Sequence, residues 1–289
     1  MATASFEEKQ YEYAANLEIA VGGLGGNQVR PAGQVLEGIV GYDAAAQIDP
    51  EHSIWKVLQM NRPPGTLLYP RLWAPGPQPR LGSLPPIRCH LVLQYKRPEY
   101  LAGHRAKQWA HWRRPYFRFA VEKGQQRVLE NLERAAAGRL LVRYAAPAFT
   151  TVQALEVATA LGIVLESSGF VAPSLLKGHR AWTYEAPGIA GYANPRGESF
   201  EFESADSLAD QVRNLPSSDQ LAIDVSVTRQ MALALTYRSP RLRQIATRVG
   251  YAVRSLSLEI SPERESELVA YITVQTILSR VGAQWLVLL

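Results

Sequence analysis

Residues 88–98 read RCHLVLQYKRP and carry the strongest β-strand signal in the chain. Because side chains alternate along a strand, the residues divide between two faces, with His90, Val92, Gln94 and Lys96 on one and Cys89, Leu91, Leu93 and Tyr95 on the other. Residues i and i+2 share a face, so a half-buried strand of this kind sets Gln94 beside Lys96. The stretch therefore predicts an apolar strand that ends in two neighbouring polar groups.

Helix and strand signals alternate on both sides of this strand. Apolar residues recur at helical spacing over residues 5–21, and Ser5 with Glu8 matches a capping box at the start of that helix. Thr150 or Thr151 is expected to cap a later helix. The alternation predicts an α/β fold. The expected elements are, in order, a helix at 5–21, a helix at 31–38, a strand at 39–46, the strand at 88–98, a helix at 122–137, a strand at 139–149 and a helix at 150–161.

The second half of the chain is expected to be mostly helical. A short strand at 199–204 precedes segments with helical periodicity, at 206–214, 219–237, 241–249 and 262–278. We therefore expect two domains, residues 1–170 and residues 171–289. The stretch 61–86 contains too many prolines for a central strand or a helix interior, and it is expected to be an insertion in the first domain.

The composition narrows the classes of protein. The chain has 289 residues, of which 47% are hydrophobic and 20% charged, a balance typical of globular proteins. It contains no apolar run long enough to cross a membrane, and the first residues do not match a secretory signal. With Cys89 as its one cysteine, the chain has no internal disulfide and no cysteine-rich zinc site. A reducing, cytoplasmic location is the expectation.

Positive charge is concentrated directly after the central strand. The formal net charge is +5, and residues 96–118 are rich in Lys, Arg and aromatic rings with a single acid. Cations bind phosphates and rings stack on unpaired bases, so the run favours nucleic acid as a partner over a membrane. Alternatively, the rings are core residues and the cations only solvate an outer face. The cations expected to bind nucleic acid are Arg97, Arg105, Lys107, Arg113, Arg114 and Arg118.

The polar end of the strand also suits phosphodiester hydrolysis. That reaction needs carboxylates to hold a divalent metal and a lysine to orient or activate water. Gln94 offers an amide oxygen, Lys96 offers an ammonium, and Asp43 on the strand expected at 39–46 offers a carboxylate. An acid on the first helix would add a further ligand.

These parts resemble the PD-(D/E)xK nuclease superfamily, and more narrowly its Mrr-type branch with a QxK motif. The match lies in an acidic first helix, Gly41-Tyr42-Asp43 and Gln94-Tyr95-Lys96, within residues 5–165. The resemblance implies a restriction-endonuclease-like mixed sheet flanked by helices, Mg²⁺ or Mn²⁺ as cofactor, cleavage of DNA or RNA, and an antiphage role with a regulatory partner or a homo-oligomer.

The resemblance also assigns roles to residues. Asp43, Gln94 and Glu18 would hold the metal, and Lys96 would position the attacking water. Glu18 is favoured by its spacing from Asp43, while Glu12, nearer the apolar stripe of the helix, and Glu37, close to Gly41-Tyr42-Asp43 in sequence, remain alternatives. Asp43 is far from Gln94 in sequence, so Asp49 or Glu51 remains an alternative to it.

Two other functions compete with a nuclease. Residues 239–257 resemble a helix-turn-helix, with a turn at 249–251 and a second helix at 253–260 that directs Arg254 and Ser255 toward the major groove. This pattern would suit a DNA-binding regulator. The apolar end AQWLVLL would instead suit a non-catalytic subunit of a complex, unless it is buried as a final helix or strand.

Overall fold

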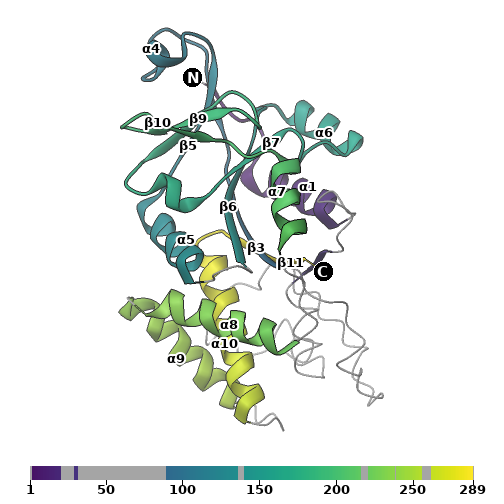
Figure 1. The fold of residues 1–289 in the computed structure, drawn as a ribbon, viewed down its shortest axis with the longest axis vertical. Coiled ribbons are helices and arrows are strands. Elements are labelled where there is room, and N and C mark those ends of the chain that lie inside the picture. Colours follow the sequence, from purple (N-terminus) through teal and green to yellow (C-terminus); the bar gives the residue numbers. More distant parts are fainter. Residues whose placement is uncertain are drawn as a thin grey trace. The chain divides into compact units, whose positions relative to one another are not determined.

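The computed structural model describes residues 2–20, 29–31, 89–135, 140–215, 221–237, 239–255 and 262–288. The chain is a mixed α/β protein that divides into two compact units (Figure 1). Unit 1 contains residues 1–29, 91–133 and 141–215, and unit 2 contains residues 30–90, 134–140 and 216–289. The boundary expected after residue 170 falls inside a strand of unit 1 instead. The strand at 39–46, most of the helix at 31–38 and the insertion at 61–86 lie outside the described residues.

Unit 1 contains a six-stranded sheet in which every neighbouring pair is antiparallel. Most of its strands are only three to five residues long, which is too short to give a clear alternation in the sequence. Only the last of them was expected. The order is β1 (Ala2–Thr3), β4 (Glu99–Leu101), β5 (Tyr116–Ala120), β8 (Ala181–Tyr184), β9 (Ala190–Asn194) and β10 (Glu198–Glu201).

The expected central strand is β3 (Cys89–Tyr95), which neighbours β6 (Leu140–Pro147), itself followed by β7 (Ser168–Val171). The strands at 88–98 and 139–149 are therefore confirmed. The half-buried character is wrong, because residues 90–95 are almost fully buried on both faces of β3. A strand covered on both faces reads as a nearly continuous apolar run, as residues 91–93 do between His90 and Gln94.

The expected helices of unit 1 form close to their predicted bounds. They are α1 (Glu8–Ala20), α5 (Lys123–Ala135), α6 (Val152–Leu161) and α7 (Ala205–Asn214). Thr151 is the N-cap of α6, since its side chain accepts a hydrogen bond from the Ala154 amide at 3.1 Å. Gly162 ends the same helix with a φ of +66°, a left-handed conformation that glycine adopts without strain.

The capping box at Ser5 is wrong. The Ser5 hydroxyl accepts a hydrogen bond from the Val152 amide at 2.9 Å, so it serves the start of α6 and not its own helix. The side chain of Gln10 instead accepts from the Glu7 amide at 2.7 Å at the start of α1. A short local motif was thus overridden by a contact between segments far apart in the sequence.

Within unit 1, the six-stranded sheet and the sheet strands β3, β6 and β7 share an aromatic core. The Tyr184 hydroxyl on β8 donates to the Pro147 carbonyl oxygen on β6 at 2.7 Å, and the rings of Phe119 and Tyr144 lie 5.7 Å apart. Tyr184 also packs on Phe202, with ring centroids at 4.4 Å. Large rings that bury their faces and satisfy their hydroxyl groups fix the two sheets against one another.

The described part of unit 2 contains α8 (Leu221–Thr236), α9 (Pro240–Ser255), α10 (Pro262–Arg280), β2 (Val29–Pro31, with Val29 assigned to unit 1) and β11 (Gln284–Leu288). The helix-turn-helix is wrong, because α9 continues through residues 249–251 without a turn. Gly250 lies inside this helix, where a Cβ atom would lie 3.8 Å from Val269 of α10. The glycine therefore lies in a helix interior and not in a turn, and the basis for a DNA-reading second helix is removed.

The apolar C-terminal segment forms β11, in which Trp285 and Leu286 are buried. The Trp285 indole donates a hydrogen bond to Nδ1 of His90 at 3.1 Å, so this end is a packed strand of unit 2. Within the described residues, none of the helices is long and apolar enough to cross a membrane.

Candidate active site

Lys96 lies directly after the last residue of β3, in a buried position at 8% exposure. Its amide donates to the Ala145 carbonyl oxygen of β6 at 2.8 Å, which fixes the backbone beside that strand. Its ammonium donates to Oε1 of Gln125 on α5 at 2.5 Å and lies 5.6 Å from the ring centre of Tyr144. The fold therefore holds a lysine cation among side chains of two neighbouring elements.

The ring beneath Lys96 is itself fixed in place. The Tyr144 hydroxyl donates to Oε1 of Gln126 at 2.7 Å, and Nε2 of Gln126 donates to the Pro173 carbonyl oxygen at 2.6 Å. Gln126 is buried, so these hydrogen bonds are shielded from water. These bonds fix the Tyr144 ring in place. Because the face of an aromatic ring attracts a cation, the fixed ring also helps to hold the Lys96 ammonium.

Two carboxylates act on the Lys96 charge. Burial lowers the pKa of Lys96, while the charges of Glu8 on α1 and Glu122 before α5 oppose that effect. Burial likewise raises the pKa of Glu8, against the attraction of Lys96, and the charge of Glu12 raises it further. Groups whose pKa values are shifted by burial and by a specific charge partner are typical of functional sites.

Glu12 follows the half-buried Glu8 by one helical turn and is itself buried, at 7% exposure. Its carboxylate forms an ion pair with Lys9 at 2.6 Å, and its charge adds to the effect of burial and of Tyr11 in raising the pKa of Tyr95 on β3. Of the acids considered on the first helix, Glu12 is thus the one whose charge reaches the end of β3. Glu8, which the sequence suggested only as part of a capping box, joins it there.

Gln94 has an unused acceptor. The side chain is 1% exposed, and its Nε2 donates to the Tyr95 carbonyl oxygen at 3.1 Å. Its Oε1 has no hydrogen-bond partner in the described part of the chain. A buried carbonyl oxygen without a partner costs about 1–3 kcal/mol, so a group that meets this oxygen would be stabilising.

The oxygen atoms near Lys96 are of the type that binds a hard divalent cation, but the described residues do not supply a full set of ligands. Carboxylate and amide oxygens are the ligands that Mg²⁺ and Mn²⁺ prefer, and Glu8, Glu12 and Gln94 supply such oxygens. The described residues contain no group of three or more His, Cys, Asp or Glu side chains that could hold a metal. Asp43, Glu37, Asp49 and Glu51 lie outside the described residues.

Glu18 is engaged elsewhere. Its carboxylate accepts hydrogen bonds from the Val164 amide at 2.7 Å and the Leu165 amide at 3.3 Å, in the turn after α6. Burial raises its pKa although these bonds oppose that shift. The structure therefore places this acid at the connection between α6 and β7, where neither Gln94 nor Lys96 is among its partners.

The half-buried charge of Glu8 predicts a pH-dependent gain in stability for the Glu8→Gln variant. The folded-state pKa of Glu8 is raised above 4.5. Between pH 4.5 and that raised pKa, the folded protein binds more protons than the unfolded chain, so it loses stability as pH rises. Gln does not titrate and escapes this loss. We expect the variant to melt higher than the wild type near neutral pH, with the difference disappearing below about pH 4.5.

Melting temperatures measured across that pH range test this prediction. Glu7→Gln is the matched control, because Glu7 precedes Glu8 and its side chain is mostly exposed. A difference between Glu8→Gln and the wild type that stays constant with pH, or that shrinks as pH rises, would contradict a raised pKa at Glu8.

Half of the cations expected to bind nucleic acid are engaged in the fold. Arg97 donates from Nε to the Ala4 carbonyl oxygen at 2.9 Å, and Arg118 pairs with Glu99 at 3.3 Å. Arg114 forms an ion pair with Glu185. These contacts tie the first residues and the strands of the six-stranded sheet together, so phosphate binding would compete with them.

The other three cations lie between β4 and β5, in the basic connection, residues 102–115, which includes α4 (Trp109–Trp112) (Figure 1). Arg105, Lys107 and Arg113 are exposed and form no ion pair among the described residues. Arg113 has a φ of +54°, the left-handed region that costs a non-glycine residue about 1–3 kcal/mol. These three side chains are the ones available to phosphates.

Of the rings that the alternative interpretation placed in the core, Tyr116 at the start of β5 is fully buried, whereas Trp109 and Trp112 of the basic connection are only half-buried. The rings of Trp112 and Tyr116 stack at 5.8 Å, and the Trp112 indole donates to Oγ1 of Thr183 at 3.2 Å. His111 packs edge-on against Tyr192 of β9 at 3.9 Å. The rings therefore anchor the connection on the six-stranded sheet, while its cations project from it.

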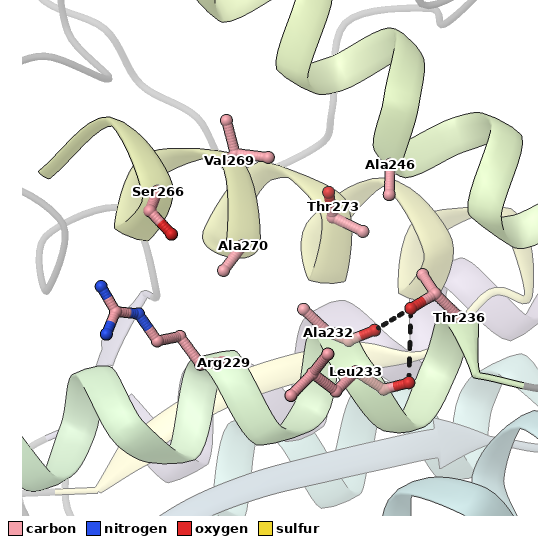
Figure 2. A pocket seen from close by; sticks show the side chains of 9 residues that line it. All are labelled: Arg229, Ala232, Leu233, Thr236, Ala246, Ser266, Val269, Ala270 and Thr273. Carbon is pink, nitrogen blue, oxygen red and sulfur yellow. Dashed lines mark hydrogen bonds between the residues drawn. The ribbon is translucent and has the colours of Figure 1, made fainter. Parts of the chain in front are cut away.

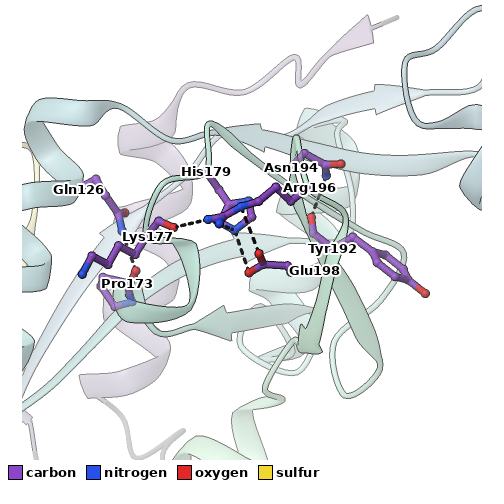
Figure 3. A network of polar contacts seen from close by, with 8 residues as sticks. All are labelled: Gln126, Pro173, Lys177, His179, Tyr192, Asn194, Arg196 and Glu198. Atoms are coloured by element: carbon purple, nitrogen blue, oxygen red, sulfur yellow. Dashed lines mark hydrogen bonds and ion pairs between the residues drawn. The ribbon is translucent and has the colours of Figure 1, made fainter.

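A second polar cluster contains a buried histidine (Figure 3). Nε2 of His179 lies 3.1 Å from Oε2 of Glu198 and 3.3 Å from Nη2 of Arg196, and Nε of Arg196 lies 3.1 Å from Oε1 of Glu198. Arg196 also donates to the Lys177 carbonyl oxygen at 3.1 Å. The His179 side chain is fully buried, whereas Arg196 and Glu198 are partly exposed, and the cluster fixes the turn between β9 and β10.

Sequence reasoning missed three contributors to the candidate site. Glu122 and Gln125 come from the start of α5 and Tyr144 comes from β6, and only tertiary packing brings them to Lys96. One signal was readable. Glu8 and Glu12 are four residues apart and share a helix face, which would have favoured them over Glu18 as acids that point toward one place.

In comparisons with known proteins, no family model, no curated protein and no solved structure matches the chain.

Proposed function

We propose that unit 1 is the catalytic part of a metal-dependent nuclease that hydrolyses phosphodiester bonds of DNA or RNA. The observation that carries the proposal is the buried Lys96 at the end of β3, with a lowered pKa and with Glu8 and Glu122 close enough to act on its charge. A cation buried at a cost to stability is rarely retained without a role. The proposal includes a restriction-endonuclease-like core for β3, β6 and the helices around them.

Each residue has a distinct part in the proposed reaction. Glu8 or Glu12 and the free Oε1 of Gln94 would hold Mg²⁺ or Mn²⁺, which supplies charge stabilisation at the phosphate. Lys96 donates hydrogen bonds to a non-bridging phosphate oxygen and orients the attacking water. Gln125 and the Tyr144 ring hold the ammonium in place before substrate arrives. Glu18, given its engagement after α6, is not part of this proposal.

The basic connection suits the same reaction. Arg105, Lys107 and Arg113 follow the catalytic strand in sequence and are exposed, so they would contact the phosphate backbone of the substrate. Such contacts carry no base preference by themselves. An antiphage role, with a partner or a second copy that controls the activity, extends the proposal and rests on the family resemblance.

Cleavage assays with the full chain test the proposed function. Supercoiled plasmid, single-stranded DNA and RNA are incubated with the protein in Mg²⁺, Mn²⁺ or excess EDTA. We expect at least one substrate to be cut with metal and none with EDTA, because the carboxylates act only through the cation. A folded protein that leaves all three substrates intact with either metal would count against a nuclease.

A further inference from the structure

The helices of unit 2 line an open cavity that the proposed nuclease function does not use. α10 packs on both α8 and α9, and small side chains face one another where the helices meet, namely Ala232, Ala246 and Ala270. The space they leave has a volume of about 440 Å³ (Figure 2). Small-molecule sites in proteins commonly occupy roughly 300–1,000 Å³, so the cavity is large enough for a ligand.

Polar groups are confined to a few points of the wall. Arg229 of α8 and Ser266 of α10 lie at one end of the cavity, as Figure 2 shows. The Arg229 guanidinium is 45% exposed, and its two contacts are long, 3.5 Å to the Glu263 carbonyl oxygen and 3.7 Å to Glu267. A guanidinium has five N–H donors in a planar fork, so most of them are available to an anion.

A buried hydroxyl also lines the cavity. Thr273 is 1% exposed, and its Oγ1 has no hydrogen-bond partner within the described residues. Thr236, by contrast, donates to the Ala232 carbonyl oxygen of its own helix at 2.8 Å. An unpaired buried hydroxyl is costly, and a ligand atom that accepts its hydrogen bond would remove that cost.

The remainder of the wall is apolar. Leu233, Val269 and Ala270 line it, and Leu233 is 68% exposed although it is a large aliphatic residue. We propose that this cavity binds a small amphipathic anion, with a carboxylate or similar group on Arg229 and Ser266 and an apolar body along Leu233, Val269 and Ala270. The proposal does not depend on the nuclease function.

Binding of anilinonaphthalene sulfonate to the full chain tests the proposal, because this probe combines an aromatic body with one anionic group. We expect saturable fluorescence with a single class of site, displaced by decanoate. Arg229→Gln should weaken binding by about tenfold or more, since a charge-assisted hydrogen bond is lost. Ala246→Leu and Ser266→Leu should abolish it by filling the space. Arg248→Gln is the matched control, an exposed arginine of α9 outside the cavity.

Two results would overturn the proposal. One is equal probe binding by the wild type and both leucine variants, which would place the probe elsewhere. The other is an equal loss of probe binding in Arg229→Gln and Arg248→Gln, which would mean that only the net charge of the protein matters. Ser266 is exposed, so its leucine variant is expected to fold, and circular dichroism on each variant checks that the comparison is valid.

Discussion

Lys96→Met is expected to lower metal-dependent phosphodiester cleavage by at least about a hundredfold and to leave the fold intact. Removal of a preorganised charged donor from an active site typically costs a factor of this order or more. Methionine keeps the length of the apolar stem over Tyr144 and removes only the ammonium. The loss should appear in kcat, because a group that acts on the developing phosphate charge contributes mainly in the transition state.

The same substitution should change stability little. Burial lowers the pKa of Lys96, which means that holding its charge in the folded protein is unfavourable. Between the lowered folded-state pKa and 10.5 the unfolded chain binds more protons, so the wild type gains stability as pH rises there, whereas the methionine variant does not. Removal of the unfavourable charge therefore favours the folded methionine variant at neutral pH. Loss of the hydrogen bond to Gln125 offsets part of that gain in stability, by about 1 kcal/mol.

Lys123→Met provides the matched control for the activity measurement. Lys123 is exposed at the first position of α5, and it lies outside the set of groups that act on Lys96. Its substitution removes one positive charge without touching the candidate site. Cleavage rates that fall equally in both variants would indicate a general effect of charge on substrate binding. A Lys96→Met rate equal to that of the wild type would remove Lys96 from the mechanism.

The elements around the candidate site were readable because local signals and packing agree there. β3 and β6 have apolar runs of the right length, and α6 carries its own cap at Thr151 and its own stop at Gly162. Where a signal depended on spacing alone it failed. Gly250 suggested a turn, yet it lies inside α9, which packs on α10, and tertiary packing of this kind overrides local propensity.

The sequence predicted the two polar residues at the end of β3, but not all of the side chains that surround them. Gln94 and Lys96 were identified because they are two residues apart on one strand. Which acids reach the site depends on which turn of α1 faces β3. Spacing favoured Glu18, whereas Glu12 is the buried acid and Glu8 is the one whose charge interacts with Lys96. Gln125 reaches Lys96 across 29 positions of sequence, and no local pattern encodes that contact.

Gly191→Ala is expected to destabilise unit 1 by about 1–3 kcal/mol or more, through overpacking of a filled core. Gly191 is buried in β9, and a Cβ atom there would overlap the Trp182 indole ring and lie 2.9 Å from the Thr183 carbonyl oxygen. Trp182 is fully buried, so its ring has no free space to move into. Thermal or denaturant unfolding measures the loss.

Gly124→Ala is the control with the opposite sign, since a Cβ atom at this exposed position of α5 meets nothing within 4 Å and should stabilise the helix by about 0.5–1 kcal/mol.

A double-mutant cycle separates the overlap from any effect of glycine on the backbone. Replacing Trp182 by Leu leaves space beside Gly191, so Gly191→Ala should cost much less in that background than in the wild type. The coupling energy is expected to reach about 1 kcal/mol or more, with the two substitutions partly compensating. Strictly additive costs would mean that a methyl group introduced at position 191 does not meet the indole ring, and the packing described for β8 against β9 would then be incorrect.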